Sequence, residues 1–122
     1  MIFVFGSNLA GRHGKGAALY ALQKEGAIYG QGEGLQGNSY GIPTKDRNLK
    51  TLDIETIKYY TNRFLMFVEN NRDKTFLLTP IGCGLAGYKQ EQIYPLFLPL
   101  PKNIILHKDW KINKNDNSSH PN

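Results

Sequence analysis

Cysteine is almost absent from this sequence of 122 residues, in which Cys83 stands alone. A single cysteine excludes an intrachain disulfide and a metal site built from several thiolates, and it fits a reducing compartment. No apolar run approaches the roughly 20 residues of a membrane span. The N-terminal apolar run is too short for a signal peptide and has no basic region before it. We therefore expect a soluble, cytoplasmic protein with no membrane partner, and we predict neither a metal site nor a cofactor.

Acidic residues are in the minority, because 10 Asp and Glu stand against 15 Lys and Arg, for a net charge of +5. Such an excess favours an anionic partner. The cations are scattered along the chain, whereas nucleic-acid-binding domains usually gather them on one helix or stripe. We therefore favour a phosphate-bearing small molecule, and a basic nucleic-acid-binding domain is the weaker alternative.

Glycine is plentiful, with 13 residues, and it is concentrated after apolar segments. Residues 76–78 form a short uncharged run that predicts a buried strand. Pro80 ends this strand, and Gly82, Gly84 and Gly87 follow. A buried strand that leads into a glycine-rich turn and then a helix is typical of a ligand site at the carboxyl edge of an α/β sheet. The alternative is an ordinary tight connection between a strand and a helix.

A second unit of the same kind occupies the N-terminus. Residues 2–5 predict another apolar strand, residues 6–16 are rich in glycine, and residues 17–25 are alanine- and leucine-rich helix formers. The first amides of such a helix lack internal partners and attract anions, phosphate above all. Two units of this kind in one small domain predict two loops that meet over one cleft.

Two familiar phosphate motifs are excluded. Lys15 follows a glycine as in a Walker loop, but Gly16 stands where that motif needs Ser or Thr. Residues 32–37 spell G-x-G-x-x-G, yet no strand is predicted before them and no helix after them. We expect residues 26–38 to be an irregular loop, with Ile28 and Tyr29 as anchors.

The remaining segments complete a single domain. Apolar patterns predict strands at 39–42 and 103–107, a helix that begins at the N-cap Asp53 and ends near 70–71, and a short helix at 90–97. The polar loop at 44–48 either faces the same cleft or is a plain surface turn. This order of elements predicts a mainly parallel sheet with helices on both faces. Residues 111–122 have almost nothing to bury, so we expect a disordered tail.

Three stretches, in the same order, carry a resemblance that covers roughly residues 1 to 106. Residues 14–26, with GSNLA at 6–10 before them, are similar to the glycine-bearing loop and first helix of a small macrodomain. SYGIPTK at 39–45 resembles the strand that ends in a Thr-Lys pair, and PIGCGL at 80–85 resembles the second glycine loop. The branch of the macrodomain superfamily that it most resembles removes terminal ADP-ribose from glutamate. The resemblance implies a three-layer α/β/α fold over residues 1–110.

The resemblance also implies a cleft for ADP-ribose or a related NAD-derived nucleotide, free or carried by an ADP-ribosylated protein. In such domains the first loop holds the distal ribose, which we expect Asn8 to face with Tyr88 at the same end. The second loop wraps the diphosphate with backbone N–H groups, in agreement with the anion binding expected of glycine-rich backbone. The expected ligand-binding residues are Gly6, Ser7, Asn8, Leu9, His13, Gly14, Lys15, Gly16, Thr44, Pro80, Ile81, Gly82, Cys83, Gly84, Leu85, Ala86, Gly87 and Tyr88.

Catalysis is a separate hypothesis. In the glutamate-specific branch the lysine of the Thr-Lys pair attacks the distal ribose, and an aspartate directly after the second motif assists release. Lys45 occupies the lysine position, but Ala86 occupies the aspartate position and cannot transfer a proton. Asp46 or His13 are the candidates to replace it. Binding is therefore the first expectation and hydrolysis through Lys45 the alternative. Cys83, which has no identifiable partner base, is expected to fill space rather than to react.

Overall fold

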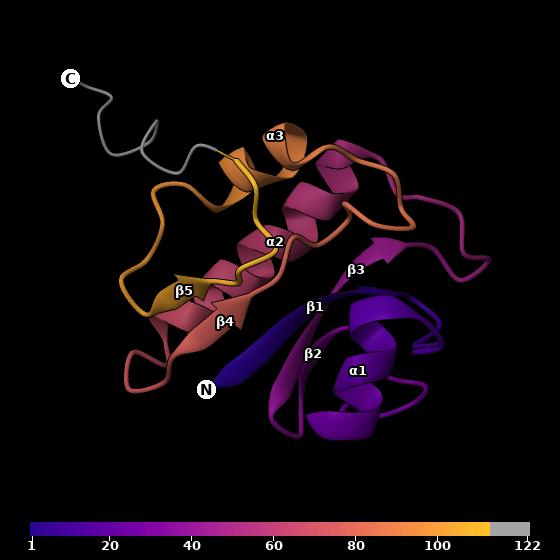
Figure 1. The fold of residues 1–122 in the computed structure, drawn as a ribbon, viewed down its shortest axis with the longest axis horizontal. Coiled ribbons are helices and arrows are strands. Elements are labelled where there is room, and N and C mark those ends of the chain that lie inside the picture. The colour runs from indigo at the N-terminus through magenta and orange to yellow at the C-terminus, as the bar shows by residue number, and fades with distance from the viewer. Residues whose placement is uncertain (113–122) are drawn as a thin grey trace.

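The computed structural model describes residues 1–112, which form a mixed α/β domain around one five-stranded sheet (Figure 1). The strand order is β2-β3-β1-β4-β5. Every neighbouring pair is parallel except β2 and β3, which are antiparallel. The mainly parallel sheet predicted from the sequence is thus confirmed. The strands are β1 (Ile2–Asn8), β2 (Gly34–Gln36), β3 (Ser39–Lys45), β4 (Phe76–Leu78) and β5 (Ile104–Leu106).

Helices pack on both faces of the sheet (Figure 1). One face carries α1 (Gly16–Lys24), and the other carries α2 (Ile54–Glu69), α3 (Gln90–Ile93) and the 3-10 helix Tyr94–Phe97. Side chains of β1 alternate between the two faces, as the pleat of a strand requires. Val4 joins the larger core cluster under α2, whereas Phe5 joins the smaller cluster under α1.

The α2 helix matches its predicted bounds. The side chain of Asp53 accepts a hydrogen bond of 2.8 Å from the backbone N–H of Thr56, which satisfies one free donor of the first turn. Ile57 and Phe64 are fully buried. The ring of Phe64 lies 5.7 Å from that of Phe76, centroid to centroid. The buried side chains of α2 therefore belong to the hydrophobic core.

Two strands are longer than predicted. β1 continues to Asn8, three residues beyond the predicted end at 5, and β3 continues through Pro43 to Lys45. Proline interrupts a strand that is paired on both sides, but β2 pairs with β3 only as far as Gly41. At Pro43 itself, β3 therefore has a strand partner on one side only, and a proline is tolerated there.

The prediction for residues 26–38 was wrong in two respects. The segment contains the strand β2, and Ile28 and Tyr29 are exposed rather than anchoring it. The anchor is the buried Gln36, whose side chain accepts from the N–H of Ile28 and donates to the carbonyl of Gln31. A polar side chain that satisfies the backbone of its own segment gives no apolar pattern, which is why the sequence concealed it.

The last described residues pack against the sheet. Trp110 is buried, and its indole Nε1 donates a hydrogen bond of 2.8 Å to the carbonyl of Leu78. Of the predicted disordered tail, residues 113–122 lie outside the described residues. Among residues 1–112, no helix has the length and apolar character needed to cross a membrane.

Replacing Phe64 by alanine should lower the free energy of unfolding by about 3–5 kcal/mol, because it leaves a cavity under α2. Urea unfolding of the variant and the wild type measures the difference. Met66→Ala is the matched control on the same helix, since Met66 is 66% exposed and should change stability little. Equal losses for the two variants would contradict the packing of α2 described here.

Candidate ligand-binding site

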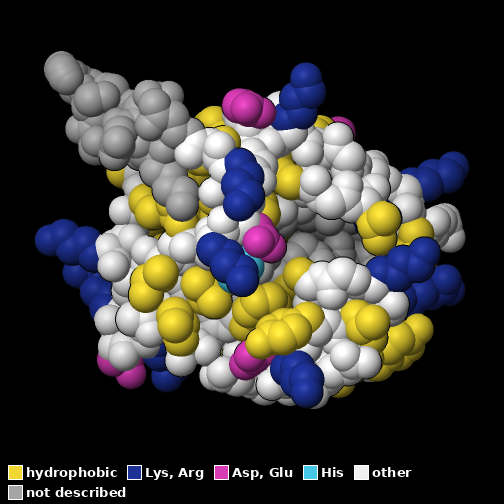
Figure 2. Space-filling model, in the orientation of Figure 1, with side chains coloured by type: hydrophobic (Ala, Val, Ile, Leu, Met, Phe, Trp, Pro, Cys, Tyr) yellow, Lys and Arg dark blue, Asp and Glu magenta, His cyan; other side chains and the backbone are white. Residues whose placement is uncertain are grey.

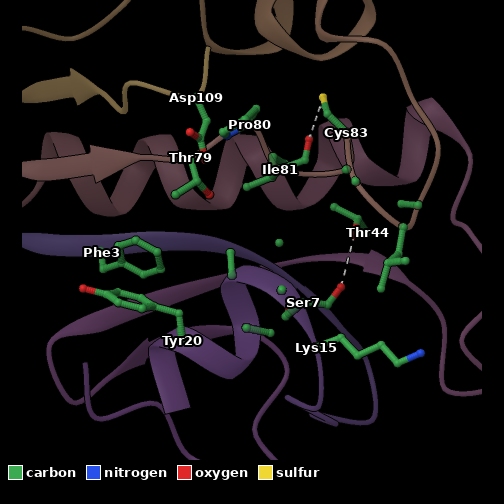
Figure 3. A pocket seen from close by; sticks show the side chains of 18 of the residues that line it. Phe3, Ser7, Lys15, Tyr20, Thr44, Thr79, Pro80, Ile81, Cys83 and Asp109 are labelled. Atoms are coloured by element: carbon green, nitrogen blue, oxygen red, sulfur yellow. Dashed lines mark hydrogen bonds between the residues drawn. The ribbon is translucent and has the colours of Figure 1, made fainter. Parts of the chain in front are cut away.

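The two glycine-rich loops lie side by side at one edge of the sheet. Because β1 and β4 are parallel neighbours, their carboxyl ends meet at the same edge. The first loop, residues 6–16, and the second loop, residues 79–88, both contribute to the lining of one open cavity of about 1420 Å³ (Figure 3). The loops also touch, since a Cβ added at Gly6 would lie 3.2 Å from the backbone nitrogen of Gly82. The predicted meeting of the two loops is confirmed.

Most of the predicted site residues line this cavity. They are Gly6, Ser7, Asn8, Gly14, Lys15, Gly16, Thr44, Lys45, Pro80, Ile81, Gly82, Cys83, Gly84, Leu85 and Ala86. Leu9, His13, Gly87 and Tyr88 do not line it. The face drawn in Figure 2 is hollowed near its centre, with hydrophobic side chains beside the hollow.

The second loop leaves a row of backbone donors free. Its internal hydrogen bonds use the N–H groups of Ile81, Cys83, Gly87 and Tyr88. No acceptor within residues 1–112 pairs with the N–H groups of Gly82 or of the consecutive residues 84–86. Successive unpaired amides in a glycine-rich turn form a nest that binds anions.

The first loop leaves a second row of donors at the start of α1. This helix begins after Lys15, which provides no side-chain cap, and the first turn contains no acidic residue. In the described part of the chain, the N–H groups of residues 14–18 have no acceptor. The positive end of the helix dipole adds to their attraction for an anion.

Asn8 lines the cavity, but its amide is partly occupied by the first loop itself. Its Nδ2 donates to the carbonyl of Arg12, and its Oδ1 accepts from the N–H of Arg12, both at 2.9 Å. The side chain therefore fixes the turn at 8–12. These two bonds use one N–H of Nδ2 and one lone pair of Oδ1, so the amide keeps a second donor and a second acceptor site.

The prediction that His13 faces a ligand was wrong, because its side chain is completely buried and does not line the cavity. Its Nε2 lies 2.9 Å from the carbonyl oxygen of Gln31 and 3.1 Å from Oε1 of Gln36. Both neighbours are acceptors, so Nε2 carries the proton and donates. His13 thus fastens the first loop to segment 26–38 and is not available to a ligand or to catalysis.

Tyr88, Leu9 and Gly87 also act on the loops rather than on the cavity. The phenol of Tyr88 donates a hydrogen bond of 2.7 Å to the carbonyl of Leu52. The N–H of Leu9 donates to the carbonyl of Lys45 at 3.0 Å, and that of Gly87 donates to the carbonyl of Gly84 at 3.1 Å. These hydrogen bonds fix the backbone of the two loops and are made by residues that do not line the cavity.

The charge at the loop end of the cavity is positive. Arg12, Lys15 and Lys45 line it, and within residues 1–112 none of them has a carboxylate oxygen within 4.0 Å. The acidic residues of the lining lie elsewhere: Glu25 follows the C-terminal end of α1, and Asp109 follows β5. Asp46, the other predicted acid, caps its own turn by accepting from the N–H groups of Asn48 and Lys50.

Cys83 fits its prediction as an inert residue. The thiol is half-buried, and its Sγ lies 3.3 Å from the carbonyl oxygen of Ile81. Burial, with a smaller contribution from Glu91, raises the pKa of the thiol to about 11. At neutral pH Cys83 is therefore protonated, and a protonated thiol is a poor nucleophile.

Sequence reasoning missed the far end of the cavity. Phe3 and Tyr20 line it with their ring centroids 4.9 Å apart, and Leu77 and Asp109 contribute from β4 and from the segment after β5 (Figure 3). These side chains come from four separate segments with ordinary core or surface patterns. Only the fold brings them together, so no local signal could have found them.

No protein-family model, curated protein or solved structure matches the chain. The macrodomain resemblance thus depends on the three motifs alone. Within residues 1–112, no group of three His, Cys, Asp or Glu side chains is placed to hold a metal ion.

Alkylation of Cys83 by iodoacetamide should be slow at pH 7.5 and should still be rising steeply at pH 9. The reason is that the pKa of the thiol is raised to about 11, so the reactive thiolate increases about tenfold per pH unit over this range. The rate is measured by mass spectrometry against pH, and the urea-unfolded chain is the control. A rate that levels off below pH 9 in the folded protein would contradict the raised pKa.

Proposed function

We propose that this protein binds ADP-ribose or a related NAD-derived nucleotide in the cavity between its two glycine-rich loops. The observation that carries the proposal is the pair of free amide rows, residues 14–18 and 84–86, that line one cavity. Two rows of donors suit the two phosphates of a diphosphate. Lys15 and Lys45, which have no carboxylate partner in the described chain, add the charge that such a ligand would neutralise.

The size and the side chains of the rest of the cavity favour a nucleotide over a free phosphate as the ligand. Its volume of about 1420 Å³ exceeds the roughly 300–1,000 Å³ typical of small-molecule pockets. Phe3, Tyr20 and Leu77 supply apolar surface at the far end, where a base would bury its ring. Asp109 lies at the same end, so the lining changes from backbone amides to a mixture of aromatic, aliphatic and acidic side chains.

A three-layer, macrodomain-like fold is part of the same proposal. Helices on two faces of a mainly parallel sheet agree with it, and so does the position of the three motifs. Each of these motifs, 14–26, 39–45 and 80–85, contributes residues to the cavity. An ADP-ribosyl group attached to a protein is a further candidate ligand, because the cavity is open to solvent.

Hydrolysis of an ADP-ribosyl bond is the second candidate function. Lys45 supports it, since it lines the cavity half-buried at the end of β3. Against it, Ala86 offers only a methyl group where the resemblance expects an aspartate, and His13 and Asp46 are occupied elsewhere. Binding is therefore the function that the geometry supports best.

Titration calorimetry with ADP-ribose, ADP, NAD, ATP and adenosine tests the binding proposal. ADP-ribose should bind, and adenosine, which lacks the diphosphate, should bind at least about tenfold more weakly. Lys15→Ala should weaken ADP-ribose by about three- to tenfold. Lys24→Ala, at the other end of α1 and outside the cavity lining, is the matched control.

Failure of every nucleotide to saturate the protein would reject the proposal. Tight binding of an oligonucleotide that weakens steeply with salt would instead favour the nucleic-acid-binding alternative.

The hydrolase candidate is tested on a peptide that carries ADP-ribosyl-glutamate. We expect no turnover by the wild type, because within residues 1–112 no carboxylate oxygen lies within 4.0 Å of the Lys45 amine. Lys45→Ala should then retain ADP-ribose affinity to within about tenfold. Arg47→Ala, in the adjacent exposed turn, is the control. Turnover by the wild type that Lys45→Ala abolishes and Arg47→Ala retains would establish the hydrolase instead.

A further inference from the structure

The turn after β3, residues 46–52, is fastened to the second loop by two reciprocal hydrogen bonds. Thr51 of the turn donates its hydroxyl to the carbonyl of Ala86, at 2.9 Å. Tyr88 of the loop donates its hydroxyl to the carbonyl of Leu52, at 2.7 Å. We refer to these two bonds as the clasp. Because each segment supplies one donor and one acceptor, the clasp fixes the exit of the loop against the turn.

The end of β3, which leads into this turn, is bonded to the first loop. The N–H of Leu9 donates to the carbonyl of Lys45 at 3.0 Å, and the hydroxyl of Thr44 donates to the carbonyl of Ser7 at 3.2 Å. Lys45 pairs in turn with Thr51 in an isolated bridge. A continuous path of hydrogen bonds therefore runs from the first loop, through the end of β3 and its turn, to the second loop.

The middle of the second loop has little packing of its own. An ideal Cβ at Gly84 or Gly87 would meet no atom within 4 Å, and Leu85 is 68% exposed. The bond from the N–H of Gly87 to the carbonyl of Gly84 closes the turn but does not attach it to the sheet. The N–H of Tyr88 closes the base of this turn by donating to the carbonyl of Gly82 at 2.9 Å. Beyond that base, the clasp ties residues 86 and 88 to the turn after β3.

We infer that the clasp sets the separation between the two amide rows and thereby selects a diphosphate over a monophosphate. Thr51 and Tyr88 are positioning residues in this account, because their hydroxyl groups act through the backbone of the loop. The inference rests on the proposed function, in which both rows bind one ligand. A monophosphate needs only one row, whereas a diphosphate bridges the two.

The test compares ADP with AMP, which differ by one phosphate, on Thr51→Val, Tyr88→Phe and the double variant. Each single variant should weaken ADP by about three- to tenfold, the range of one hydrogen bond, and AMP by less than about twofold. The backbone amide resonances of residues 84–86 should shift in the free variants. Thr51→Ser, which retains the hydroxyl, should restore the wild-type ratio of the two affinities.

Three results would overturn the inference. Parallel losses for ADP and AMP, or a wild-type ratio in the double variant, would show that the clasp does not set selectivity, while the proposed function would stand. A wild type that binds ADP-ribose but neither ADP nor AMP would reject the inference alone, whereas a wild type that binds none of the three would reject the proposed function as well. If Tyr88→Phe fails to fold, Thr51→Val decides the matter, since Thr51 is exposed and its replacement should change stability little.

Discussion

The parallel pairing of β1 with a neighbour on each side is the constraint on which the site depends. β3 pairs along one edge of β1 and β4 along the other, so three chain segments leave the sheet at the same edge. The carbonyl of Val4 accepts both from the N–H of Thr79, at 3.2 Å, and from its hydroxyl, at 2.6 Å. These two hydrogen bonds tie the start of the second loop to the middle of β1. The absence of a side chain at Gly6 then lets the two loops approach.

Hydrogen bonds from side-chain donors to backbone carbonyls hold the loops in place. Polar side chains around the cavity donate to backbone carbonyls: Asn8 to Arg12, Thr44 to Ser7, Thr79 to Val4, Thr51 to Ala86 and Tyr88 to Leu52. These bonds hold the backbone around the cavity in place. Among the described residues, the N–H groups of 14–18 and 84–86 remain without an acceptor. The site is therefore made mostly of backbone, with side chains as its supports.

Sequence reasoning predicted the elements that have an apolar period and missed what depends on tertiary contact. The strands at 2–5 and 76–78 and the helix after Asp53 each carry their own pattern, so their positions were correct. The strand β2 and the anchor Gln36 carry none, because a glycine-rich segment held by an amide side chain looks like a loop. The two glycine-rich loops also carry their own pattern, and they were placed correctly at one cavity. His13 and Tyr88 were predicted to bind the ligand but do not line the cavity, because tertiary contacts decide where their side chains lie.

Binding and hydrolysis make different demands on this cavity. Binding needs donors that are held in place, and the free amides supply them without any change of protonation. Hydrolysis by Lys45 needs a neutral amine and a group that takes up and returns a proton. Among the described residues, His13 is completely buried outside the cavity lining, with Nε2 hydrogen-bonded and Nδ1 without a partner, and Asp46 caps its own turn. At position 86 the carbonyl supports the loop and the methyl group does no chemistry. The free amides thus meet the demands of the proposed binding, whereas the hydrolase candidate needs a proton-transferring side chain beside Lys45 that the described residues do not place there.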